Sequence, residues 1–173
     1  MKLWQKDAQT ELNNFDMRIK ADYRQFVAED AGLIAIMALL MGAVPVIIRD
    51  FDRMVGIAMT SLAVFLLIIL LVRYVLLVSV KWVVEDETLC RMKGVFSKQT
   101  DYIEMYRITD YMENQSFLQR LFGVKTVTVY STDRSDSVTD ILGVPADMDL
   151  IGIIREKVEK CKKEKRIYEI ANH

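Results

Sequence analysis

Uncharged, apolar positions dominate two long stretches of the chain, Ala31–Ile48 and Met54–Val72. Only the short segment Arg49–Arg53 separates them. At about 1.5 Å per helical residue, each stretch is long enough to cross a hydrocarbon core of about 30 Å. Two helices with so short a connection form a hairpin that enters and leaves a bilayer on the same face. The pattern therefore predicts a transmembrane helical hairpin over residues 31–73.

The alternative interpretation is a helical hairpin buried in a soluble core. Such helices are usually shorter and carry a polar stripe, which both stretches lack. The hydroxyls of Thr60 and Ser61 can bond backbone carbonyls one turn back, so they do not oppose a spanning helix. The composition of both stretches favours membrane insertion.

Basic residues flank the hairpin on the side of the two chain ends. Lys and Arg near helix ends mark the cytoplasmic face, whereas Asp and Glu contribute little to this bias. The connection carries Arg49 and Arg53 beside Asp50 and Asp52. The flanking basic residues are Arg18, Lys20, Arg24, Arg73, Lys81, Arg91 and Lys93. We expect an inner (cytoplasmic) membrane protein with both termini in the cytoplasm, and Arg73 reaching the headgroups.

Residues 1–30 show apolar positions at intervals of three or four. This spacing predicts an amphipathic helix before the hairpin. Its apolar stripe consists of Leu12, Phe15, Ile19, Tyr23 and Phe26. Its charges are mixed in sign, which favours packing on protein over binding to the lipid surface by charge.

The pattern changes to a period of two after residue 74, which is typical of β-strands. Strands are predicted near Val78–Val84, Thr88–Lys93, Val95–Tyr106, Arg107–Asn114, Val124–Tyr130 and Ser137–Leu142, with a helical turn at Ser116–Leu121 ended by Gly123. Glu85–Glu87 and residues 132–136 read as turns. We expect six or seven strands in a single antiparallel sheet or barrel.

A helical pattern returns after Pro145. Leu150, Ile154, Val158 and Cys161 share one face, and Asp147 or Asp149 is placed to cap the first turn. The predicted fold class is therefore a membrane protein of α+β type. A cytoplasmic antiparallel domain, residues 74–166, follows the hairpin and is closed by a C-terminal helix, and residues 167–173 form a tail.

Composition excludes several functions. The chain of 173 residues has 23 basic and 24 acidic side chains, a balance that argues against nucleic acid as a partner. Cys90 and Cys161 have no metal-type spacing, and the single histidine is His173. We therefore expect no metal site, no cofactor and no small-molecule substrate.

Several segments resemble the bacterial pleckstrin-homology (PH) domain family. They are Lys93–Thr100, Tyr106–Asp110, Gln115–Val124 and Thr126–Val129, and they occur in the family's order and spacing. The resemblance covers residues 71–160. It implies a strongly bent sheet plugged by the C-terminal helix, after a pair of membrane helices. It also implies binding rather than catalysis.

Eukaryotic relatives hold inositol phosphates with basic residues around the loop of the first strand pair. In this chain that loop is Glu85–Glu87, whose carboxylates repel phosphate. Lys81, Arg91 and Lys93 flank it and are the candidate lipid-binding residues, together with the basic end of the C-terminal helix. Sensing of anionic lipids is therefore the second hypothesis.

The first hypothesis is a membrane-anchored interaction module. It would be a non-catalytic subunit or adaptor of an inner-membrane assembly, such as one for secretion, transport or envelope stress, or a homo-oligomer. The expected contact is an exposed strand edge. Tyrosines suit interfaces, although each one also fits a half-buried sheet position. The candidate contact residues are Tyr102, Tyr106, Tyr111 and Tyr130.

An enzyme is the third hypothesis. Asp133 and Asp136 are candidate carboxylates, but they lie in a turn with no base, nucleophile or glycine-rich phosphate loop nearby. We therefore predict no catalytic residues.

Overall fold

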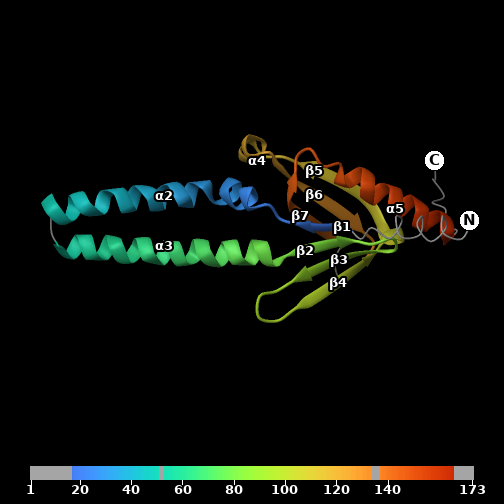
Figure 1. Cartoon of the computed structure of the whole chain (residues 1–173), viewed down its shortest axis with the longest axis horizontal. Coiled ribbons are helices and arrows are strands. Elements are labelled where there is room, and N and C mark those ends of the chain that lie inside the picture. The colour runs from blue at the N-terminus through green and yellow to red at the C-terminus, as the bar shows by residue number, and fades with distance from the viewer. Residues whose placement is uncertain (1–16, 51–52, 134–136, 166–173) are drawn as a thin grey trace, which may run out of the picture.

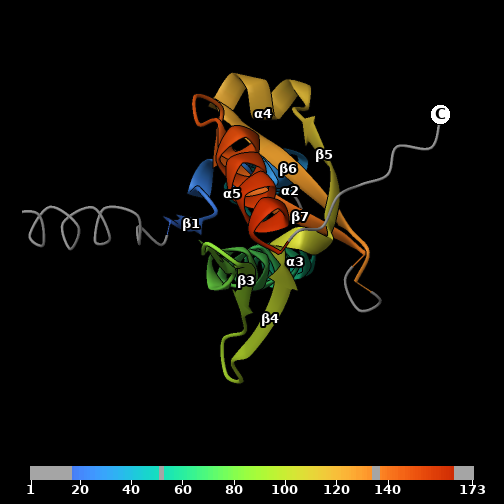
Figure 2. The same ribbon diagram turned by 90° about the vertical axis from the view of Figure 1, so that its right-hand side faces the viewer.

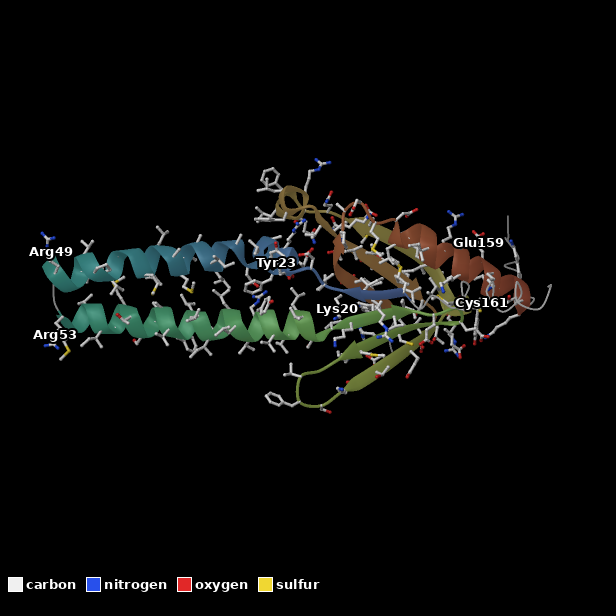
Figure 3. The ribbon with its side chains drawn as sticks, viewed as in Figure 1. Lys20, Tyr23, Arg49, Arg53, Glu159 and Cys161 are labelled. Carbon is white, nitrogen blue, oxygen red and sulfur yellow. The ribbon has the colours of Figure 1, made fainter. Side chains whose placement is uncertain are left out.

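The computed structural model describes residues 17–50, 53–133 and 137–165. Figure 1 shows an elongated molecule with a helical hairpin at one end and a β-rich domain at the other. Arg49 and Arg53 lie at the free tip of the hairpin, whereas Glu159 and Cys161 lie at the opposite, distal end of the domain (Figure 3). The end of the domain that adjoins the hairpin is called the proximal end below.

The hairpin consists of α2 (Tyr23–Asp50) and α3 (Arg53–Ser79). Both helices are long and apolar enough to cross a membrane, and most of their side chains are exposed. The helical hairpin predicted from the two apolar stretches is thus present. Helix α3 continues past residue 73, the predicted end of the transmembrane segment, to Ser79. The strand expected from Val78 begins only at Lys81.

The helix predicted across residues 1–30 is wrong at Met17–Lys20, whereas residues 23–30 are helical as the first turns of α2. Met17–Lys20 form strand β1, and α2 starts only at Tyr23. In β1 the side chain of Ile19 is buried and those of Arg18 and Lys20 are exposed, a period of two. Ile19 lies opposite Trp82 of the next strand, so tertiary pairing overrides the helical spacing. Residues 1–16 lie outside the described part.

Strands β2 (Lys81–Val84), β3 (Thr88–Lys93) and β4 (Gln99–Glu104) continue this sheet in the order β1-β2-β3-β4. Strands β5 (Ile108–Asn114), β6 (Val124–Ser131) and β7 (Val138–Pro145) form a second antiparallel sheet. The expected single sheet or closed barrel is therefore corrected to two sheets. The 3₁₀ turn η1 (Met105–Arg107) breaks the extended chain between β4 and β5.

Helix α5 (Leu150–Glu164) closes the core as predicted, and the Asp149 carboxylate accepts a hydrogen bond from the Gly152 N–H at 2.9 Å. Viewed from the distal end, α5 lies before the second sheet while the β3–β4 hairpin extends away from it (Figure 2). One apolar cluster joins both sheets and α5. Its fully buried members include Val84, Leu89, Ile103, Met105, Val127, Ile141, Leu150 and Ile154.

Helix α4 (Phe117–Phe122) forms where the sequence predicts a helical turn. The Ser116 hydroxyl accepts from the Gln119 N–H, and the Gln119 side chain accepts from the Ser116 N–H, a capping box. Gly123 ends the helix at φ 69°, a left-handed conformation that glycine adopts without steric cost.

Candidate interaction sites at the two ends of the domain

A charge pair joins the two helices of the hairpin at the proximal end. Arg73 Nε lies 3.1 Å from Asp30 Oδ1, and the Asp30 side chain is 4% exposed against 47% for Arg73. The sequence interpretation assigned Arg73 to the headgroups and missed Asp30. The sequence did contain a signal for this pair. Positions 30 and 73 are equally distant from the hairpin tip and therefore face each other across two antiparallel helices.

A cavity of about 380 Å³ adjoins this pair, between the base of the hairpin and both sheets. Its apolar lining includes Phe26, Leu76, Leu77, Val80, Trp82 and Leu142, and its charged lining includes Glu29, Asp30, Arg73, Arg91, Lys93 and Asp140. Three acidic and three basic side chains give it no net charge. This balance provides no selective attraction for an anion.

Two of the three predicted lipid-binding residues are bound to one carboxylate. Arg91 donates to Asp101 Oδ2 through Nε and Nη2 at 3.1 and 2.7 Å, and Lys93 Nζ lies 3.1 Å from the same oxygen. These contacts, led by the hydrogen bond from Arg91, lower the pKa of Asp101 to about 2. The Arg91 guanidinium also lies over Trp82, 5.7 Å from the ring centre. This arrangement leaves Arg91 with a structural role between β3 and β4.

Lys81 and Lys93 nevertheless line a common cleft of about 130 Å³ at the end of α3. Lys98 also lines this cleft and was not among the predicted residues. The sequence separates Lys98 from Lys81 by a full hairpin, but β2 and β3 pair so that Lys81 lies opposite Met92. The register therefore brings the connection after β3 next to the start of β2.

The acidic loop Glu85–Glu87 lies at the distal end, against α5. Lys157 donates to Asp86 at 2.7 Å, and this hydrogen bond is the main cause of the lowered pKa of Asp86. Lys165 Nζ lies 3.2 Å from Glu87. The basic end of α5 thus pairs with the loop, and the fold separates it from the lysine cleft with which it was predicted to bind lipid.

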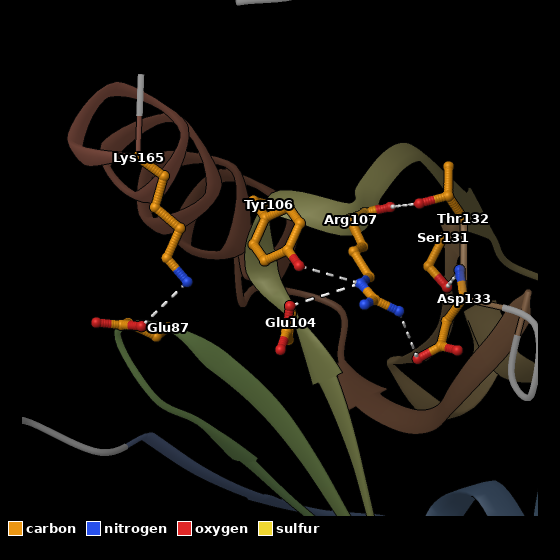
Figure 4. Close-up of polar contacts among 8 residues, drawn as sticks. All are labelled: Glu87, Glu104, Tyr106, Arg107, Ser131, Thr132, Asp133 and Lys165. Atoms are coloured by element: carbon orange, nitrogen blue, oxygen red, sulfur yellow. Dashed lines mark hydrogen bonds and ion pairs between the residues drawn. The ribbon is translucent and has the colours of Figure 1, made fainter. Parts of the chain in front are cut away.

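A second group of polar contacts surrounds η1 at the distal end (Figure 4). Arg107 lies 3.5 Å from Glu104 and 3.8 Å from Asp133. Its hydrogen bond with the Tyr106 hydroxyl raises the pKa of Arg107. Asp133 therefore takes part in a surface ion pair, and Asp136 lies outside the described residues. These contacts brace the turn between the two sheets.

The four predicted contact tyrosines occupy different environments. Tyr106 and Tyr111 pack against the core cluster, and Lys165 Nζ lies 4.8 Å above the Tyr106 ring. Tyr130 is half-buried on β6, with its hydroxyl 4.0 Å from the Met112 sulfur. Tyr102 is the exposed member, at 61%. It lies on β4, whose one strand neighbour in the described part of the chain is β3.

Residues 30–160 match the family described as Bacterial PH domain. The chain belongs to this family. The match runs from Asp30 in α2 into α5, so it includes most of the hairpin as well as both sheets. No curated protein and no solved structure matches the chain.

Membership in the bacterial PH domain family supports a general function as an interaction module. PH-like domains are generally non-catalytic. The family does not identify a partner.

Proposed function

We propose that this chain is a membrane-anchored interaction module, a non-catalytic subunit or adaptor of a bacterial inner-membrane assembly or of a homo-oligomer. In this proposal α2 and α3 span the bilayer, and the PH-like domain and both termini lie in the cytoplasm. The two apolar helices support membrane association. The basic residues beside the domain-side ends of the helices support the orientation.

The observation that carries the proposal is the open edge of β4. Residues Gln99–Glu104 have β3 on one side and no described strand on the other. An unpaired edge offers a row of backbone donors and acceptors to which a partner strand can bond. Tyr102 is exposed at 61% and supplies a side chain of the kind that contributes strongly to interfaces.

The charge distribution supports binding of protein rather than of phosphate at the first strand-pair loop. Glu85–Glu87 keep that loop acidic, and Lys157 and Lys165 are paired with it. A phosphorylated headgroup would have to displace these lysines and then approach carboxylates. This loop is therefore excluded from the proposed ligand-binding surface.

The experiment is purification of the tagged full chain from its native membrane in mild detergent, followed by mass determination of the intact particle. We expect the chain to carry a partner, or further copies of itself, at fixed stoichiometry. Tyr102→Lys should release that partner, whereas Val138→Lys, at a 54% exposed apolar position on β7, should retain it. A monomer from wild-type membranes would contradict the proposal.

Binding of an anionic lipid is the second candidate, favoured by the cleft of Lys81, Lys93 and Lys98 beside the end of α3. Three ammonium groups at the expected headgroup level attract anionic lipid. Native mass spectrometry of the full chain should then show retained phosphatidylglycerol in preference to phosphatidylcholine. The preference should disappear in Lys81→Glu/Lys93→Glu and persist in Lys160→Glu at the distal end. Equal retention of both lipids would reject this candidate.

A further inference from the structure

Helix α4 carries a pair of exposed apolar side chains. Phe117 is 81% exposed and Leu121 is 70% exposed. Their spacing of four residues places them on one face of the helix. Gln119 is buried, so this apolar face is turned away from the contact that holds α4 to the rest of the protein. Neighbouring exposed apolar side chains that form a contiguous patch mark interaction or membrane sites more often than single ones do.

The same helix is attached to the start of the hairpin. Gln119 donates from Nε2 to Gln25 of α2 at 2.9 Å and to Thr126 of β6 at 2.8 Å. The Gln119 carbonyl oxygen meanwhile accepts from the Ser116 N–H at 2.8 Å. One buried amide thus joins α4, α2 and β6. The position of the Phe117 and Leu121 face is therefore fixed relative to the hairpin.

The connection between β3 and β4 presents a second apolar tip. Phe96 is fully exposed and Val95 is 46% exposed. Gly94 turns the chain at φ 118°, and a Cβ there would collide with the Ser97 carbonyl oxygen. The tight turn thus depends on glycine and holds Phe96 outward. Lys98 follows it, exposed, at the lysine cleft.

Both apolar groups lie at the same level of the molecule. Figure 1 shows α4 and the β3–β4 connection on opposite sides of the hairpin, each beside the domain-side end of α2 or α3. The Asp30–Arg73 pair, which ends the uncharged part of the hairpin, is in this region of α2 and α3. A surface that surrounds the hairpin at this level reaches both groups at once.

We propose that Phe96 with Val95, and Phe117 with Leu121, enter the interfacial layer of the bilayer that the hairpin spans, on either side of it. This inference rests on the proposed membrane span. Insertion would remove apolar surface from water, and the neighbouring cations Lys98 and Arg120 would lie among the headgroups. The PH-like domain then contacts the membrane at three places, namely the hairpin and the two apolar groups. Its orientation relative to the hairpin is thereby fixed.

A partner protein is a less economical occupant. It would have to contact two small apolar groups on opposite sides of a transmembrane hairpin, whereas the bilayer is continuous around it. A domain held on the bilayer by both apolar groups also has a fixed direction for the edge of β4. The interaction surface therefore has a defined orientation relative to the membrane.

Spin labels on single introduced cysteines test the depth of these positions in the full chain, reconstituted in phosphatidylethanolamine/phosphatidylglycerol vesicles. The labelled positions are Phe96→Cys and Phe117→Cys, with Val95→Cys and Leu121→Cys as second variants of each group. Leu67→Cys in α3 serves as the bilayer control, and Glu159→Cys at the distal end serves as the aqueous control. The parent chain, whose Cys90 and Cys161 are buried, provides the background labelling.

We expect labels at both groups to lose collisions with a water-soluble nickel reagent several-fold relative to Glu159→Cys and to gain collisions with oxygen, as Leu67→Cys does. If Leu67→Cys reports the bilayer while all four test positions match Glu159→Cys, the proposed entry of the two apolar groups into the bilayer is wrong, whereas the proposed membrane span is supported. If Leu67→Cys itself reports water, the proposed membrane span fails first. Entry of only one of the two groups into the bilayer would also contradict the proposal that the domain contacts the membrane on both sides of the hairpin.

Discussion

Strands β6 and β4 show how burial differs between a central strand and an edge strand of the same domain. Strand β6 is the centre of its sheet, with β5 and β7 on either side, and six of its eight residues are buried. Strand β4 is at the edge of its sheet, and Ile103 is its one buried residue. The two strands are of similar length and belong to the same domain, so their difference in burial reflects their position.

The difference separates stability from contact. Val127 and Val129 of β6 lie in the core cluster with Leu150 and Ile154 of α5. Strand β4 is held to β3 by its ladder and by the Arg91–Asp101 charge pair, and it leaves Tyr102 and one backbone edge open. We infer that central strands such as β6 hold the fold together and that β4 is the part available to a partner.

The largest effect is expected for Val127→Ala in β6. The side chain is fully buried, so the loss of two methyl groups and the cavity they leave should lower the free energy of unfolding by about 2 kcal/mol. Urea unfolding of the full chain in nanodiscs, followed by tryptophan fluorescence, measures it. Val138→Ala at an exposed position of β7 should change stability by less than about 0.5 kcal/mol. Equal losses of stability in Val127→Ala and Val138→Ala would contradict the assignment of β6 to the core.

The hairpin differs from both strands because a charge pair between Asp30 and Arg73 links its two helices at the proximal end. Arg73→Leu should destabilise by about 2 kcal/mol, since it leaves the buried Asp30 carboxylate unpaired; the half-exposed arginine reduces the cost below that of a fully buried pair. Asp30→Asn should cost less, because Arg73 retains contact with solvent. The same unfolding assay ranks the two variants, and a larger loss for Asp30→Asn would contradict this account.

A smaller effect is expected where charge holds β4 to β3. Asp101→Asn should lower stability by about 1 kcal/mol at neutral pH, because both Arg91 and Lys93 lose their shared carboxylate. The pKa of Asp101 falls from 3.8 to about 2 in the folded protein, so the contribution is complete above pH 3.8 and is lost as the pH falls toward 2. Thermal melting against pH should show the two chains converging over this window. A constant difference down to pH 2 would exclude this carboxylate as the cause.

The smallest effect on stability is expected at the exposed face of β4. Tyr102→Lys should shift the free energy of unfolding by less than about 0.5 kcal/mol, since the side chain is 61% exposed. The substitution thereby separates loss of a partner from loss of fold. Thermal melting of the purified variant is the measurement, and a fall comparable to that of Val127→Ala would place Tyr102 in the core and remove it as a contact.

Elements with a strong local pattern could be predicted from the sequence. The helical hairpin follows from two uncharged stretches, and β3 was predicted with its observed limits, Thr88–Lys93. Helix α4 with Gly123 and helix α5 with the Asp149 cap follow from local hydrogen-bonding rules that act within a few residues. In each case the residues that define the element are close in sequence.

The missed features depend on residues distant in sequence. Strand β1 forms because Ile19 pairs with Trp82, and its short alternation is hidden within a longer helical spacing. The break predicted between Tyr106 and Arg107 coincides with η1, but that the chain changes sheet there depends on which strands pair. The pairing of Arg91 and Lys93 with Asp101 needs the β3–β4 register. Their basic character alone suggested lipid binding, and the partner carboxylate could not be assigned without the fold.

The most direct test of the proposed interaction module is photo-cross-linking in the native membrane, with a photoreactive amino acid at position 102 of the full chain. The account predicts a cross-linked product of one defined mass from position 102 and none from Glu159, which is exposed at the distal end of the domain. Products of the same mass from both positions, or none from position 102, would contradict the assignment of β4 as the binding edge.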